Sequence, residues 1–165
     1  MLVATLLTMS IVGVACNVED AHYRLRGVPY VTAQFRVTNT GPDWPAGVAL
    51  ELKMQRSGRS YWFIPWEGGT SDLRHMASVK DVSASNWRPP DPDRAEDRPL
   101  GDLDYVGTDT HYNVIGRVPH RGGAAPAHML LLNLGDVLKH RVGEQLLPQQ
   151  FFDLVSCIKA NDHRR

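Results

Sequence analysis

Three histidines, His111, His120 and His128, fall within one segment of the chain that also carries Asp109. An imidazole beside a carboxylate can act as a general base or bind a metal ion. The spacing of these residues matches no known catalytic or metal-binding motif, and the sequence contains no G-x-S-x-G, H-E-x-x-H or phosphate-binding glycine loop. A hydrolase that uses His and Asp side chains on loops is therefore the alternative function, and we predict no catalytic residues, no metal and no cofactor.

Aromatic side chains that could bind a ligand are concentrated at Tyr61, Trp62, Trp66 and Trp87. Polar residues follow Trp66 directly, from Glu67 to Asp72. Aromatic faces beside hydrogen-bonding groups suit sugars or peptides. We therefore predict a ligand site formed by Trp66, Trp87, Glu67 and Asp72. The alternative is that these tryptophans fill the core.

One acidic stretch could supply the oxygen ligands that calcium needs, and it contains Asp91, Asp93, Glu96, Asp97, Asp102, Asp104 and Asp109. The spacing is not that of an EF-hand, and Arg88, Arg94 and Arg98 lie among the acids. Interleaved charges of both signs are typical of a solvated surface, and the prolines of this stretch have no backbone N–H to donate. We predict a long exposed loop at about 83–107 and no metal site there.

The first 16 residues form an uncharged apolar stretch that ends in small residues and Cys16. This pattern is typical of an export signal or of a lipoprotein-type N-terminal segment. It is short for a membrane-spanning helix, which needs about 20 apolar residues. We expect residues 1–16 to direct export and the protein to be periplasmic or anchored to a membrane by lipid on Cys16. A buried N-terminal strand is the alternative.

The chain has two cysteines, Cys16 and Cys157, near its two ends. In an oxidising compartment they either pair or only one of them is used, and lipid on Cys16 would exclude the disulfide. A disulfide would close a loop of about 140 residues and would stabilise the fold by roughly 4–5 kcal/mol.

The length and charge of the chain limit its organisation and its partners. A chain of 165 residues suits one domain with a hydrophobic core, which we assign to residues 17–165. The 18 basic and 18 acidic residues cancel, so no net positive field attracts nucleic acid. We therefore exclude nucleic acid as a partner.

Alternating apolar side chains predict a half-buried strand at 30–38 and a second strand at 48–54, joined by a turn at 39–43. An aromatic strand follows at 61–64. Pro65 either ends this strand or moves it to a sheet edge, because proline cannot donate to a ladder. Three successive strands indicate an antiparallel meander.

Later segments resume the sheet and close the chain. Met129–Leu132 is typical of a fully buried strand. Pro148 begins a segment whose apolar residues have helical spacing, so we predict a C-terminal helix that packs on the sheet. Residues 134–147 stay ambiguous, because apolar residues at helical spacing are interrupted by two glycines.

The run Phe35-Arg-Val-Thr-Asn-Thr-Gly-Pro42 resembles the strand and turn of bacterial secreted immunoglobulin-like modules, a resemblance that implies a β-sandwich. We predict a mainly β chain, an antiparallel β-sandwich-like domain with a C-terminal α-helix, with an α+β fold as the alternative. The predicted function is an exported or envelope-associated, non-catalytic binding or structural module for a small molecule, a glycan or a protein. An envelope partner or inhibitor protein is a further alternative, which an exposed apolar patch would favour.

Overall fold

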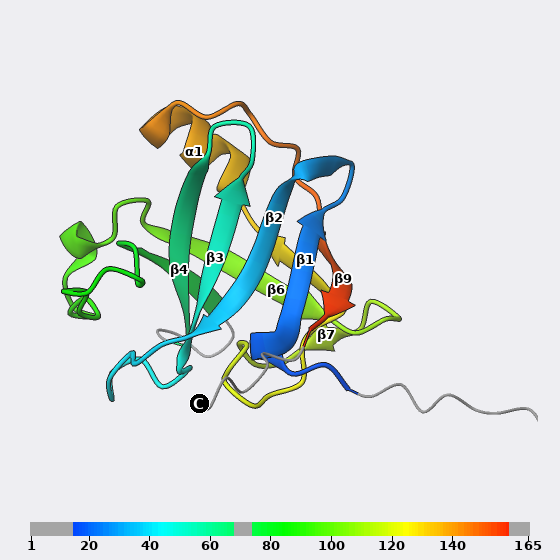
Figure 1. Cartoon of the computed structure of the whole chain (residues 1–165), viewed down its shortest axis with the longest axis horizontal. Coiled ribbons are helices and arrows are strands. Elements are labelled where there is room, and N and C mark those ends of the chain that lie inside the picture. The colour runs from blue at the N-terminus through cyan, green and yellow to red at the C-terminus, as the bar shows by residue number, and fades with distance from the viewer. Residues whose placement is uncertain (1–14, 68–73, 159–165) are drawn as a thin grey trace, which may run out of the picture.

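The computed structural model describes residues 15–67 and 74–158 (Figure 1). The proposed export segment therefore lies almost wholly outside the described residues, and so does Asp72. The strands are β1 (Ala21–Leu25), β2 (Val28–Val37), β3 (Val48–Met54), β4 (Arg59–Glu67), β5 (Arg74–Val79), β6 (Asp102–Thr108), β7 (Val114–Ile115), β8 (His128–Leu131) and β9 (Phe152–Cys157). The helices are α1 (Leu134–Val142) and two short 3₁₀ segments, η1 (Val18–Asp20) and η2 (Ala95–Asp97).

Eight of the strands form a closed antiparallel β-barrel. Their order is β5-β4-β3-β2-β1-β9-β8-β6, and the pairing of β5 with β6 completes the ring. The short strand β7 pairs with the end of β6. The chain is mainly β, as predicted, but the β-sandwich is wrong. Alternating patterns are the same in both architectures, and closure depends on the β5–β6 pairing across the long connection 80–101, which no local pattern encodes.

The barrel interior is filled by side chains. Residues predicted to be buried, Phe35 on β2 and Leu50 and Leu52 on β3, are at most 2% exposed. Leu52 lies opposite Ala33, and Leu50 lies opposite Phe35, in the β2–β3 ladder. Large buried side chains from other strands join them, including Tyr23, Phe63, Met76, Leu103, Met129 and Phe152. A hydrophobic core therefore takes the space that some barrels leave for a ligand.

The predicted C-terminal helix is wrong, because this segment is β9. Its inner side chains, Phe152 and Leu154, follow the period of a strand, and β9 pairs with β1 over the length of that strand. A short apolar segment can fit the period of a helix and that of a strand. Here the free edge of β1, which needs a pairing partner, selects the strand. Cys157 at the end of β9 is disulfide-bonded to Cys16, with 5.7 Å between their Cα atoms. A sulfur in this bond is not free to carry lipid.

The one α-helix of the described residues forms in the segment that the sequence left ambiguous, and it covers one end of the barrel (Figure 1). Leu134 and Leu138 are buried against the barrel core. Gly135 lets the helix lie against the Leu147 carbonyl, with which a β-carbon would collide. Gly143 ends the helix with a positive φ of 72°, a conformation that glycine adopts without steric cost.

Only part of the connection 80–101 extends into solvent, and the rest packs against the barrel. β6 begins at Asp102, so the segment predicted as a loop at 83–107 ends earlier. Near its end, Arg98 and Leu100 are buried. The Leu100 N–H donates to the Ser78 hydroxyl on β5. The end of the connection is therefore tied to β5, with Leu100 packed in the barrel core, before the chain enters β6.

Candidate functional site

A second apolar cluster covers the outer face of β3, β4 and β5. It contains all four tryptophans of the chain together with small and branched apolar residues; its members are Trp44, Ala49, Trp62, Ile64, Ala77 and Val79, with Trp66, Val82 and Trp87 at its margin. Trp44 comes from the β2–β3 connection, and its indole N–H donates to the Pro90 carbonyl at 2.8 Å. The β2–β3 connection and the connection 80–101 are therefore packed together on the outer wall of the barrel.

Arg98 is the charged member of this outer layer. Its guanidinium carbon lies 5.2 Å from the centre of the Trp66 ring and 5.7 Å from that of Trp44. It donates hydrogen bonds to the Asp102 carboxylate and to the Pro92 carbonyl. The side chain is only 7% exposed, so the two indole rings and the Asp102 carboxylate surround it in place of solvent. Its buried Nε has no hydrogen-bond partner within the described residues. This geometry is that of a structural ion pair.

The structure places the predicted ligand residues in two different hollows. Trp66 and Glu67 line one groove, whereas Trp87 lines another hollow beside Val79 and Pro90. Trp66 is partly buried, because its ring also packs edge-on against Trp44 at a centroid distance of 5.8 Å. Neither of these two hollows contains both Trp66 and Trp87.

The groove at Trp66 and Glu67 lies at the barrel end opposite α1. It has a volume of about 410 Å³ and is lined by Pro45, Ala46, Pro65, Trp66, Glu67, Arg117, Val118 and His120. Pro65 does not end β4: the β3–β4 ladder stops at Phe63, and beyond it β4 pairs only with β5. The end of β4 is therefore free on one side to form the groove wall.

A hydrogen bond fixes the opposite wall of the groove. The Val118 N–H donates to the Glu67 carboxylate at 3.0 Å. The connection 116–127 is joined to the β2–β3 connection as well, because the Arg121 N–H donates to the Ala46 carbonyl at 2.8 Å. The walls thus come from three segments that are distant in sequence and are held together by one hydrogen bond to a side chain and one between backbone groups.

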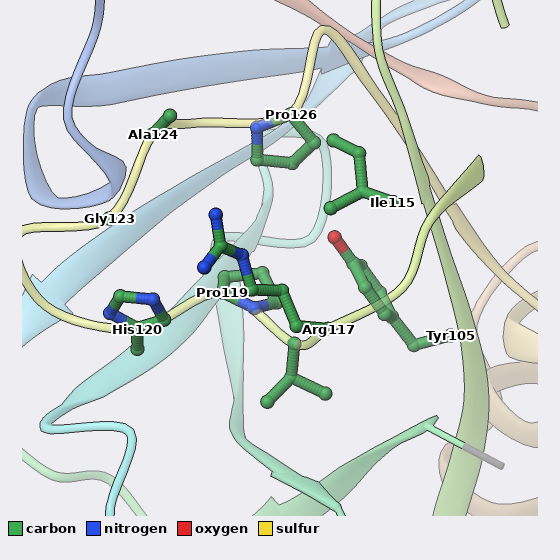
Figure 2. A pocket seen from close by; sticks show the side chains of 9 residues that line it. Tyr105, Ile115, Arg117, Pro119, His120, Gly123, Ala124 and Pro126 are labelled. Carbon is green, nitrogen blue, oxygen red and sulfur yellow. The ribbon is translucent and has the colours of Figure 1, made fainter. Parts of the chain in front are cut away.

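A smaller pocket adjoins the groove and shares Arg117, Val118 and His120 with it (Figure 2). Figure 2 shows the Arg117 side chain reaching into the middle of this pocket, with Tyr105 on one side and His120 on the other. The cavity holds about 20 Å³, space for a group the size of one water. Its polar groups therefore converge on a single small volume.

His120 has a defined orientation in this pocket. Its Nδ1 lies 3.1 Å from the Arg121 carbonyl oxygen, which can only accept, so Nδ1 carries the proton and Nε2 points elsewhere. The ring lies tightly against Gly123, where a β-carbon would be 2.8 Å from Cε1. Glycine at this position is what lets the imidazole sit there.

The three histidines that the alternative hydrolase could use do not come together. His111 contacts the Thr110 hydroxyl, and His120 contacts a backbone carbonyl. Of the three, only His128 meets a carboxylate: its Nδ1 lies 2.7 Å from Oδ1 of Asp153. Asp109 instead accepts hydrogen bonds from the N–H groups of His111 and Asn113.

The His128–Asp153 pair belongs to a surface network. Arg26 donates to both oxygens of Asp153, at 2.9 and 2.7 Å, and to the Tyr112 hydroxyl at 2.8 Å. The hydrogen bonds from Arg26, and then that from His128, hold the pKa of Asp153 below its usual range. Tyr112 stacks parallel to the His128 ring at 4.4 Å. Within the described residues, no serine, threonine or cysteine side chain is hydrogen-bonded to His128.

Sequence reasoning missed most of the groove, including Pro45, Ala46, Arg117 and Val118, and it missed Tyr105 in the adjoining pocket. The signal that could have found part of it is the cation-rich turn Arg117–Arg121, but nothing local joins this turn to Glu67. Within the described residues, no group of three or more His, Cys, Asp or Glu side chains could hold a metal ion. The helix α1 is the longest in the described part of the chain, and none there could cross a membrane.

The fold is thus a filled, closed β-barrel with a groove at one end. Comparisons of the chain with models of known protein families, with curated proteins and with solved structures found no match. The function must therefore be argued from the groove itself.

Proposed function

We propose that the protein is an exported, non-catalytic binding module whose ligand lies in the groove beside Trp66 and Glu67. The observation that carries this proposal is the groove volume of about 410 Å³, which is within the range of small-molecule sites, about 300–1,000 Å³. The packed interior leaves the outside of the barrel for binding. A small molecule, a short glycan or a peptide end would fit.

The chemistry of the walls supports binding and gives no catalytic centre. Pro45, Pro65, Val118 and the edge of Trp66 offer apolar contact, while Glu67 and Arg117 offer hydrogen bonds. A few placed polar groups in a mostly apolar hollow are typical of ligand sites. Hydrogen bonds hold both walls in place, so the site is preorganised and loses little freedom when a ligand binds.

A groove-filling variant tests this proposal. We expect a panel of glycans, peptides and small amphiphiles, titrated into labelled protein by NMR, to shift the amide signals of Trp66, Glu67 and Val118. Val118→Trp should abolish those shifts, because an indole fills the groove. Val114→Trp is the matched control, since Val114 is 65% exposed and lies outside the groove. Ligand shifts that persist in Val118→Trp would contradict the proposed site.

Export is the second part of the proposal. The Cys16–Cys157 disulfide supports it, because structural disulfides form mainly in oxidising compartments. The intact mass of protein purified from its native source tests it: we expect cleavage close to Cys16 and a mass two hydrogens below that of the reduced form. A protein that keeps Met1 and stays in the cytoplasm would contradict export.

The hydrolase alternative rests on the His128–Asp153 pair. An oriented imidazole can act as a general base when a nucleophile or a water lies within reach. Turnover of a panel of fluorogenic esters and peptides by wild type and by His128→Gln decides it. The binding proposal expects no turnover above background in either protein, and turnover that His128→Gln removes would favour the hydrolase.

A further inference from the structure

The Tyr105 hydroxyl is an unused hydrogen-bond donor that lines the small pocket beside the groove. Tyr105 is only 4% exposed, and its hydroxyl makes no hydrogen bond to the described residues. The other buried tyrosine of the barrel, Tyr23, donates to the Pro126 carbonyl at 3.0 Å. The Tyr105 hydroxyl is not among the fully enclosed side-chain atoms that lack a partner within the described residues, so it opens onto the pocket that Tyr105 lines. A ligand in the pocket could therefore accept its hydrogen bond.

The position of this hydroxyl is set by a close backbone approach. The side chain folds along β6, and a β-carbon at Gly107 would collide with the hydroxyl oxygen. Burial raises the pKa of Tyr105 well above its usual range, and the nearby charge of Arg74 opposes that rise in pKa. The group therefore stays protonated at physiological pH and acts as a donor.

Two arginines lie in or near the same pocket. Arg117 lines it and reaches into its middle (Figure 2), and Arg74 lies close enough to act on Tyr105. Within the described residues, neither arginine forms an ion pair. Nη2 of Arg74 lies 3.5 Å from the place that a β-carbon would take at Gly116. The only carboxylate in the adjoining groove wall, Glu67, already accepts the Val118 N–H. In a chain with no net charge, this is a local excess of cations.

The space limits what can bind there. A cavity of about 20 Å³ admits about one oxygen atom of a ligand. One carboxylate oxygen can therefore enter it while the rest of the ligand lies in the groove, whereas a sugar ring cannot enter. A carboxylate is flat, and an arginine guanidinium matches it with two parallel hydrogen bonds. The shared lining residues Arg117, Val118 and His120 connect this point to the apolar walls of the groove.

We propose that Tyr105 and Arg117 bind the carboxylate of an amphipathic ligand whose apolar body lies in the groove against Trp66, Pro65 and Val118. This inference names the ligand class of the site described above and rests on that proposed function. The ligand is a small aryl or alkyl carboxylic acid, or a peptide whose apolar last residue carries the chain-terminal carboxylate.

The test compares 4-phenylbutyrate with its uncharged amide, 4-phenylbutanamide, by calorimetry on the whole protein. We expect the carboxylate to bind at least tenfold more tightly than the amide. Tyr105→Phe and Arg117→Gln should each weaken binding of the carboxylate about tenfold and leave that of the amide within twofold, since hydrogen bonds to charged groups contribute most. Arg121→Gln is the matched control, because Arg121 is on the same turn but lines neither the groove nor the small pocket. It should change the affinity for neither probe.

The outcomes separate this inference from the proposed function. If the two probes bind equally and Val118→Trp blocks both, the groove binds ligands but the carboxylate inference is overturned. If inorganic phosphate binds more tightly than 4-phenylbutyrate, the pocket is a general anion site and the inference is overturned. If neither phenyl probe binds at millimolar concentration, the inference also fails, and the glycan and peptide titrations decide the groove separately. Unchanged unfolding midpoints in Tyr105→Phe and Arg117→Gln show that these variants are folded.

Discussion

Arg98 and Arg117 both lie beside the end of β4 that carries Trp66, yet they differ in exposure, in ion pairing and in the groups around them. Arg98 is 7% exposed, has Asp102 as its acid and sits by the rings of Trp44 and Trp66. Arg117 is exposed and reaches into a pocket beside an unpartnered hydroxyl. An arginine that is buried and paired with an acid holds the fold, even though Nε of Arg98 has no partner within the described residues. An arginine that is exposed and unpaired beside a second donor is available to a ligand.

The largest expected effect comes from removing the buried, paired arginine. Arg98→Ala removes a side chain that is only 7% exposed and packs beside two indoles, while the Asp102 carboxylate it leaves is 26% exposed and can be solvated. We therefore expect the free energy of unfolding to fall by about 2 kcal/mol, less than for a fully buried pair. Urea unfolding measures this. Arg117→Ala is the control and should stay within about 0.5 kcal/mol of wild type, as for surface sites. Equal losses of unfolding free energy in Arg98→Ala and Arg117→Ala would contradict the contrast between the two arginines.

The Arg26–Asp153 pair offers an intermediate case, because it is satisfied but partly exposed. Its side chains are 40% and 30% exposed, so we expect Asp153→Asn to lower the free energy of unfolding by about 1 kcal/mol or less at neutral pH. The pKa of Asp153 is lowered in the folded state, so its contribution is present above the unfolded pKa and is lost as pH falls through the folded pKa.

The pH dependence separates this pair from other sources of acid sensitivity. Unfolding of wild type and Asp153→Asn, followed between neutral and acid pH, should converge as the carboxylate of the wild type becomes protonated. A difference between the two proteins that grows toward acid pH would contradict the assigned direction of the pKa shift.

The smallest expected effect on stability is that of Tyr105→Phe. Because the buried hydroxyl has no partner in the described structure, its removal should leave the free energy of unfolding unchanged or raise it by up to about 1 kcal/mol. Tyr23→Phe is the matched control, since its hydroxyl donates to Pro126, and it should be destabilising by about 1 kcal/mol. A loss in Tyr105→Phe as large as that in Tyr23→Phe would mean that the hydroxyl serves the fold.

Local pattern predicted β2, β3, β4 and β8, because side-chain alternation such as that at Leu50 and Leu52, or a short apolar run, directly reports a buried face. It did not predict β1 or β5, and it placed β6 in a loop. The sequence also pointed to Trp66 and Glu67, since an aromatic strand followed by polar residues is a local feature. The segment around Phe152 shows the limit: its short apolar pattern fits two periods, and only the free edge of β1 selects the strand. The pattern of neighbouring residues therefore predicts an element correctly where burial of one of its own faces is enough to determine its type.

The rest of the site depends on barrel closure. Tyr105 and Arg117 reach the end of β4 only because β5 pairs with β6, which brings the connection after β7 alongside Glu67. The placement of Trp87 has the same origin, since the connection 80–101 must pack on the outer wall before it enters β6. Contacts between distant segments leave no periodic trace in the sequence, so neither the pocket nor the separation of Trp66 from Trp87 could be predicted from it.

The most direct test of the central claim is a crystal structure of the protein with 4-phenylbutyrate. We predict the carboxylate within hydrogen-bond distance of both the Tyr105 hydroxyl and the Arg117 guanidinium, with the phenyl ring in the groove against Trp66. A phenyl ring in the groove with its carboxylate turned to solvent, or a ligand bound at the Trp87 hollow or elsewhere, would contradict the claim.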